Sequence, residues 1–206
     1  MAPLRIMNIA SVENVIANHR FSTSQVQYSD KISQAYPFYW WSMRDNKTEQ
    51  FHSGIQLVLK DVHLPIIFNN NSGSLLVKLG PENVAFNQAL QQIEDAIRSA
   101  LPEHMKHALQ PLKRIPDMGD PSLSLKCRYC AIDTEQSTAD ELMPRNIITH
   151  AVISMQKLTS YNQKLYISCQ LQACRLREPT ANDLQSLSGC GQLNRLTDDE
   201  MFDLMD

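Results

Sequence analysis

Residues 147–176 read IITHAVISMQKLTSYNQKLYISCQLQACRL, and this stretch decides the fold. Two long strand-like runs, 147–158 and 164–176, flank the short polar connection TSYNQ at 159–163. Long strand-like runs joined by a few turn-forming residues are typical of a β-hairpin. The sequence therefore predicts a β-rich fold that contains this hairpin.

Shorter strand signals lie upstream of the hairpin. The aromatic stretch 36–41 favours a strand, and strands are also predicted over 54–60, 74–79 and 122–129, with 62–68 continuing the first of these three. Residues 69–73 (NNNSG) favour a turn that joins two of them into a second hairpin. Residues 1–20 indicate a short strand or helix, and the Ser-rich stretch 21–34 a loop or edge segment.

One segment has the pattern of an amphipathic helix. Apolar residues recur at helical spacing from Phe86 to Leu101, and Asn83 can cap the first turn. The prediction is a β-rich α+β fold: five to seven strands in a small antiparallel OB-like barrel, with one inserted helix at about 83–101. A helix-backed antiparallel sheet and a jelly roll remain the alternatives.

Length and charge divide the chain into three parts. The 206 residues suit one domain with appendages. We assign 1–178 to an OB-like nucleic-acid-binding body, 179–196 to a polar linker and 197–206 to an acidic tail without fixed structure. The tail has five acids and no base, and the first 196 residues have 19 bases and 17 acids, a net charge of +2. A weakly basic body with an acidic tail suggests a polyanion as partner.

Hydropathy and cysteine content point to a compartment. No apolar run approaches the length of a membrane helix, and the N-terminal residues have no apolar stretch typical of a signal peptide. Five sparsely placed cysteines fit a reducing environment. These features predict the cytosol or nucleus, including that of a virus-infected cell, and no membrane partner.

The densest aromatic cluster is the first candidate binding site. Strand alternation would place Tyr36, Phe38 and Trp40 on one side and Tyr39 and Trp41 on the other. One side can then enter the core while the other faces solvent. Exposed rings near Arg44 and Lys47 would stack on nucleic-acid bases.

Basic residues interleaved with tyrosines form the second candidate site. They lie on the strand predicted near 122–129 and on the long hairpin, where the bases would meet phosphates and the rings would meet bases. The set comprises Lys126, Arg128, Tyr129, Lys157, Tyr161, Lys164, Tyr166, Arg175 and Arg177.

Motifs for metal binding or catalysis are weak or missing. Two CxxC pairs would be a strong signal for zinc, but Cys127 and Cys130 form a CxxC without a second such pair. The chain has no HExxH, GxSxG or P-loop pattern. We therefore predict no catalytic residues, no metal and no cofactor, and no enzyme activity.

The C-terminal stretch TDDEMFDLMD combines acids with apolar residues, whereas a merely solvating tail needs no phenylalanine. Together with the late segment LMPRNIITHAVISMQKLTSYNQKLYISCQLQACRLRE, it resembles the single-stranded-DNA-binding proteins of phages and large DNA viruses. The likeness covers about residues 35–206, and the chain departs from some members by ending on Asp206 instead of phenylalanine. It implies an OB-fold body whose tail competes with DNA and recruits replication or recombination proteins through Asp198, Asp199, Glu200, Phe202, Asp203 and Asp206.

The sequence therefore leads us to expect a viral, non-enzymatic, sequence-tolerant binder of single-stranded DNA used in DNA replication or recombination. A homo-oligomer remains open. The alternatives are a protein-interaction or viral structural module that uses the acidic-hydrophobic tail, and an RNA-binding protein.

Overall fold

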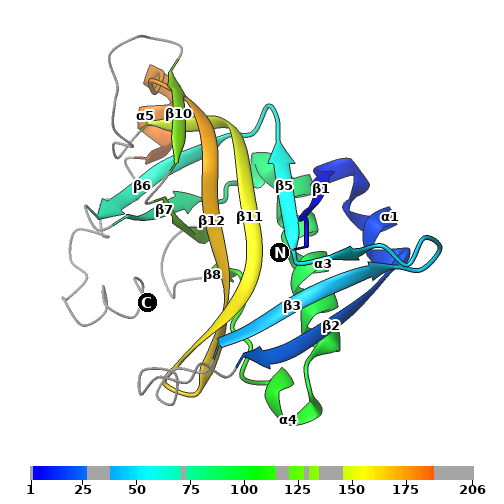
Figure 1. Ribbon diagram of the computed structural model, residues 1–206. Helices are drawn as coiled ribbons and strands as arrows, with labels where there is room; N and C mark the ends of the chain where they lie inside the picture. The colour runs from blue at the N-terminus through cyan, green and yellow to red at the C-terminus, as the bar shows by residue number, and fades with distance from the viewer. Residues whose placement is uncertain are drawn as a thin grey trace. The chain divides into compact units, whose positions relative to one another are not determined.

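The computed structural model of the chain describes residues 2–26, 38–70, 73–114, 121–127, 130–134 and 146–187. These residues, which Figure 1 draws in colour, belong to two compact units. Unit 1 comprises Met1–Val58, Ala85–Leu112 and Ile153–Gln170, and unit 2 comprises Leu59–Val84, Lys113–Val152 and Leu171–Asp206. Each strand of the long hairpin contributes to both units.

Unit 1 combines N-terminal strands with the helices α1, α3 and α4 and with parts of the long hairpin. Its elements are β1 (Arg5–Asn8), the 3-10 turn η1 (Ile9–Ser11), α1 (Val12–Ala17), β2 (His19–Val26), β3 (Phe38–Asp45), β4 (Phe51–His52), β5 (Ile55–Leu59, except its last residue), α3 (Val84–Ala100, except its first residue), α4 (Glu103–Lys106) and the adjoining parts of β11 (Ile147–Tyr161) and β12 (Lys164–Arg177). In this unit β3 pairs antiparallel with β2, β4 and β11, whereas β1 pairs parallel with β5.

Helix α3 confirms the helix predicted over 83–101. Its apolar residues at helical spacing, among them Phe86, Leu90 and Ile93, are buried. Glu94 lies on the buried side as well, but its carboxylate is paired: Arg98 Nη2 donates at 2.6 Å and the Leu112 backbone N–H at 2.9 Å. A buried charge is tolerated when such partners replace water, so this carboxylate ties α3 to residue 112.

Unit 2 is built mainly from antiparallel strands. Its elements are β6 (Leu64–Asn70), β7 (Ser74–Lys78), the 3-10 turn η2 (Pro81–Asn83), β8 (Lys113–Arg114), β9 (Ser122–Lys126), β10 (Ala131–Thr134), α5 (Ala181–Leu187) and the remaining parts of β11 and β12. Strand β7 pairs antiparallel with β6 and β9, and β8 with β9, whereas β10 pairs parallel with β12. The hairpin predicted around residues 69–73 is thus confirmed as β6–β7.

The long hairpin is confirmed too, because β11 and β12 pair with each other across Asn162 and Gln163. Both turn residues have positive φ, 46° and 63°, as a tight two-residue hairpin turn of the primed type requires.

The fold is a β-rich α+β fold, as predicted, but several details differ. The sheet is mixed, since two strand pairs are parallel. Parallel partners lie far apart in sequence, so no local turn signals them. Residues 21–26, expected in a loop, are part of β2, and 181–187 of the predicted linker form α5. The side chain of Asn83, expected to cap the helix, instead bonds the backbone N–H and C=O of His63.

Candidate nucleic-acid interface

Strand β3 carries the predicted aromatic cluster and has two different faces. Trp41 and Met43 are fully buried, at 1% and 0% exposed. The alternate residues Ser42 and Arg44 are half-buried and exposed. Because successive strand residues lie on opposite faces, position 40 belongs to the solvent-facing side and position 39 to the core-facing side.

Strand β2 lies beside β3 along its whole length (Figure 1) and places polar residues on the same solvent-facing side. The register pairs Arg20 with Arg44, Ser22 with Ser42 and Ser24 with Trp40. The hydroxyls of Ser22 and Ser42 are 2.8 Å apart and hydrogen-bonded. Residues directly opposite each other in an antiparallel ladder share a face, so these pairs line one continuous surface.

Strand β11 adds a base to this surface. Lys157 is paired in register with Trp40, and the next residue, Leu158, is paired with Tyr39. Leu158 is fully buried whereas Lys157 is half-buried, which agrees with the two faces of β3. We define the outer face as Arg20, Ser22, Ser24, Trp40, Ser42, Arg44 and Lys157.

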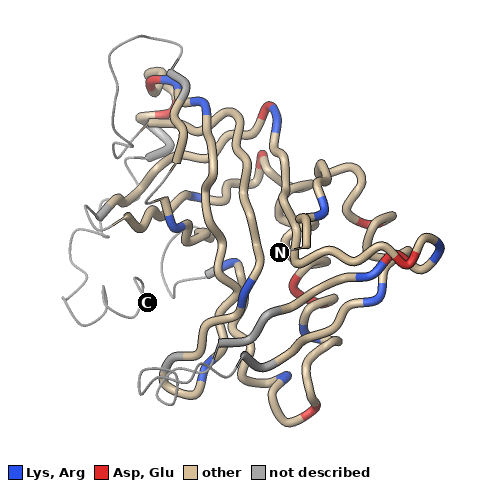
Figure 2. Tube along the Cα trace, in the orientation of Figure 1, with Lys and Arg blue, Asp and Glu red and all other residues tan. Residues whose placement is uncertain are grey.

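The turn from β3 to β4 brings one acid to the two arginines of the outer face. Glu49 accepts from Arg20 Nη2 at 2.7 Å and from Arg44 Nη1 at 3.2 Å, and all three side chains are more than half exposed. Exposed ion pairs are weak and are screened by salt. Figure 2 shows basic and acidic positions gathered at this turn. A polyanion can therefore compete with Glu49 for both guanidinium groups.

Asp45 fixes the geometry of this turn. One of its carboxylate oxygens accepts from the backbone N–H groups of Thr48 and Lys47, both at 2.8 Å. These two bonds lower the pKa of Asp45 to about 2. Glu49 itself has a φ of 56°, an uncommon left-handed conformation for a residue other than glycine. The fixed turn thus presents Glu49 to both arginines.

Trp41, which the sequence analysis included among the stacking residues, is buried. Its ring lies against Phe21, with ring centroids 6.0 Å apart and planes inclined by 12°. A side chain that is 1% exposed is not available to a base. Its area instead stabilises the core of unit 1.

The other predicted residues of unit 1 lie at several places. Lys47 is exposed on the β3–β4 turn, Lys164 is exposed at the start of β12, and Tyr166 is half-buried further along β12. Phe38, Tyr39 and Trp40 are placed by their backbone register in β3. The side chain of Tyr161 and all of Tyr36 lie outside the described residues.

The predicted bases of unit 2 do not share one environment. Lys126 and Arg175 are exposed at the end of β9 and near the end of β12. Arg177 is engaged instead: its Nη1 donates to Asp183 Oδ2 at 2.7 Å, beside His63. This partner holds the pKa of the Asp183 carboxyl well below its usual range. Arg177 therefore anchors α5 through Asp183. Arg128 and Tyr129 lie outside the described residues.

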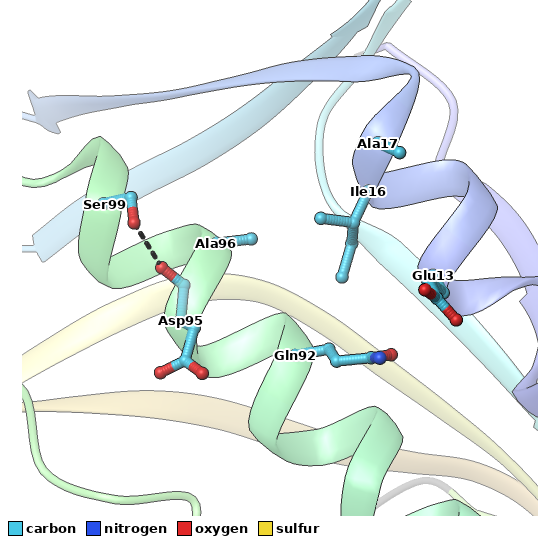
Figure 3. Close-up of a pocket in the computed structure, with 7 residues that line it drawn as sticks. All are labelled: Glu13, Ile16, Ala17, Gln92, Asp95, Ala96 and Ser99. Atoms are coloured by element: carbon cyan, nitrogen blue, oxygen red, sulfur yellow. Dashed lines mark hydrogen bonds between the residues drawn. The ribbon is translucent and has the colours of Figure 1, made fainter.

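A groove of about 390 Å³ runs between α1 and α3 (Figure 3). Ile16, Ala17 and Ala96 form its apolar lining, and Gln92 and Ser99 line it too. Glu13 and Asp95 are its charged residues, and no base lines it. Two acids repel a polyanion, so the lining of this groove does not suit nucleic acid.

Sequence reasoning missed Ser22 and Ser24 because 21–34 has the composition of a loop, and it missed Arg20 because residues 1–20 indicated only a short strand or helix. The faint signal was the alternation HRFSTSQV over 19–26, which is typical of a strand with one polar side. The described residues include four free cysteines, and no group of three or more His, Cys, Asp or Glu among them is placed to hold a metal ion.

The predicted tail residues Asp198, Asp199, Glu200, Phe202, Asp203 and Asp206 lie outside the described residues. None of the helices in the described ranges is both long enough and apolar enough to cross a membrane. Comparison with protein-family models gives no match to this chain, and comparison with curated proteins gives none either.

Proposed function

We propose that the chain binds single-stranded DNA, without catalysis and with little sequence preference, through the outer face of unit 1. The observation that supports this proposal is the register of β2, β3 and β11, which places Lys157 opposite Trp40 and the Arg20–Arg44 pair four residues further along β3 on the same side of the sheet. Other proteins bind single-stranded nucleic acid through surfaces that combine basic side chains with aromatic side chains.

Each part of the outer face has a distinct task. The two arginines and the lysine contact phosphates and release counterions, and the serine hydroxyls donate hydrogen bonds to phosphate oxygens. Trp40 stacks on a base, which contributes roughly 1–3 kcal/mol per base. Neither stacking nor phosphate contacts depend on which base is present, so the binding tolerates any DNA sequence.

The proposal also covers the fold of the body, the role of the acidic tail and the source of the chain. The body is an OB-like barrel, a fold that binds oligonucleotides through strand faces and loops. The acidic tail competes with DNA for the outer face and recruits replication or recombination proteins, and a virus is the source of the chain. The family resemblance of the tail and of the late segment supports these points.

The test is a fluorescence-anisotropy titration of labelled oligo-dT with the full chain at low and moderate salt. We expect binding that weakens as salt rises, by about 0.7 in the logarithmic slope for each phosphate contact. Replacing Lys157 by Gln should reduce both affinity and slope, whereas Lys60→Gln, at an exposed position in unit 2, should change neither.

Two outcomes would count against the proposal. Absence of binding by a folded chain would redirect attention to a protein-interaction role of the tail. Equal losses for Lys157→Gln and Lys60→Gln would place the contacts away from the outer face. Competition with unlabelled oligo-U tests the choice of nucleic acid, because a stronger effect of the ribose strand would make the protein an RNA binder.

A further inference from the structure

Two cysteines of unit 2 lie next to each other in space although 44 positions separate them in sequence. Cys174 lies on β12 and is 5% exposed, and Cys130 immediately precedes β10 and is half-buried. Their sulfur atoms are 3.8 Å apart and share a hydrogen bond. The parallel register of β10 and β12, with Ile132 opposite Cys174, holds them together.

The hydrogen bond makes the two thiols chemically different. Cys130 Sγ donates to Cys174 Sγ while both are thiols. Once Cys130 has lost its proton, its thiolate accepts from the Cys174 S–H group instead, so that the contact lowers the pKa of Cys130, and the same contact together with burial raises the pKa of Cys174. The thiolate is the reactive form of cysteine. Cys130, which is also the more accessible of the two, is therefore the attacking sulfur, and Cys174 supplies a proton beside it.

The other described cysteines lack this arrangement. Cys169 belongs to unit 1, is buried, and has its pKa raised to about 12 by burial. Cys127 is half-buried after β9, and burial together with the charge of Cys130 raises its pKa. Buried thiols with raised pKa values are inert toward oxidants.

We propose that Cys130 and Cys174 form a peroxide-reactive dithiol that closes to an intramolecular disulfide. The oxidant is a hydroperoxide such as hydrogen peroxide. This inference is independent of nucleic-acid binding, because it rests on the sulfur–sulfur contact in unit 2 alone.

The reaction has two steps. The Cys130 thiolate attacks one peroxide oxygen, so that an S–O bond forms, the O–O bond breaks and hydroxide leaves as water after protonation. The Cys174 sulfur then attacks the Cys130 sulfenic acid: the S–S bond forms, the S–O bond breaks, and the Cys174 proton leaves with hydroxide as a second water. Two thiols lose two electrons in total, and the peroxide is reduced to two waters.

The disulfide would join β12 to the residue immediately before β10. Strand β10 is a short strand of four residues that pairs with β12 through its backbone, and Figure 1 shows it beside β12. A disulfide at the N-terminal end of β10 should slow local opening of the β10–β12 ladder. The oxidised chain should therefore exchange the amide hydrogens of 131–134 more slowly than the reduced chain.

The test uses the full chain, reduced, treated with a small excess of hydrogen peroxide, blocked with N-ethylmaleimide and digested with trypsin. Trypsin separates Cys127 from Cys130 by cutting after Arg128. We expect a disulfide-linked pair of peptides, 129–145 with 165–175. Because 165–175 also contains Cys169, the same pair must form in the Cys169→Ala variant.

The Cys174→Ala variant and the disulfides formed by other cysteine pairs test the assignment to Cys130 and Cys174. Cys174→Ala should lose the linked pair and instead give a dimedone adduct on Cys130, which reports a trapped sulfenic acid. Should this variant fail to fold, the linked pair in the Cys169→Ala variant still decides, because its peptide 165–175 has Cys174 as its one cysteine. A link from Cys130 to Cys127, a link from Cys174 to Cys190, or peroxide-treated chain without an intramolecular disulfide would overturn the proposal.

Discussion

Trp40 and Trp41 are neighbours in the sequence, yet the strand places them on opposite faces. Trp41 is buried against Phe21, whereas position 40 is paired with Ser24 and Lys157 on the solvent-facing side. One residue therefore serves the core and the next serves the outer face. Single substitutions should separate the two roles.

Replacing Trp41 by Ala should lower the free energy of unfolding by about 3–5 kcal/mol, because it removes a large buried side chain. Replacing Trp40 by Ala should instead cost about 1–3 kcal/mol of binding to oligo-dT and much less stability. Chemical denaturation and anisotropy titrations of both variants check this contrast. If Trp40→Ala binds like the wild type, base stacking at this position is refuted.

Glu49 restrains the arginines of the outer face, since its carboxylate contacts both Arg20 and Arg44. The Glu49→Gln variant should bind oligo-dT more tightly and show a steeper salt dependence, by about 0.7 in slope for each guanidinium that gains a phosphate. Glu103→Gln is the matched control, because Glu103 is an exposed acid of unit 1 that pairs with Lys106. Tighter binding by both variants would indicate a general charge effect.

At the scale of elements, the hairpins and the helix could be predicted from the sequence, whereas strand β2 could not. Helix α3 and hairpin β11–β12 have strong periodicity and clear ends. The signal of β2 is a short alternation in a serine-rich stretch, and its strand conformation depends on pairing with β3. For this reason the prediction included Arg44 and Lys157 but missed Arg20, Ser22 and Ser24.

Helix α5 shows how a predicted linker acquires structure. Thr180 and Asp183 cap it reciprocally: the Thr180 backbone N–H donates to Asp183 Oδ2 at 2.7 Å, and the Asp183 N–H donates to Thr180 Oγ1 at 3.4 Å. Arg177 donates to the same carboxylate. A seven-residue helix is marginal by itself, so this carboxylate decides whether it persists.

The Asp183→Ala variant should destabilise α5 by about 1–3 kcal/mol, through loss of the cap and of a hydrogen bond to a charged group. Hydrogen exchange of 181–187 should accelerate, while that of α3 stays unchanged. Glu178→Gln is the control, since Glu178 is exposed and its backbone carbonyl still accepts from Arg177. Unchanged exchange in Asp183→Ala would show that the anchor contributes no stability.

At the scale of the whole molecule, the β-rich class could be predicted, but the division into two units could not. Strand periodicity reports which residues are buried and not which unit buries them, and β11 and β12 each serve both units. The predicted bases are divided accordingly: Lys157 lies in unit 1, whereas Lys126 and Arg175 lie in unit 2. The outer face of unit 1 became apparent only from the strand register.

The negative charge of the acidic tail predicts how the tail affects binding of DNA by the whole chain. Residues 197–206 contribute five negative charges to a chain with a net charge of −3. A chain that ends at Leu196 should therefore bind oligo-dT more tightly at low salt, and the difference should shrink at moderate salt as screening increases. Equal or weaker binding by the shortened chain at low salt would contradict competition by the tail.

Hydrogen–deuterium exchange of the full chain with and without oligo-dT, at a salt concentration where the complex forms, measures most directly whether the outer face binds DNA. The outer face predicts slower exchange in peptides that cover 19–26, 38–45 and the part of β11 around Lys157, with α3 unchanged. Protection confined to other segments, or a complex in which β2 and β3 exchange as in the free chain, would contradict binding at the outer face.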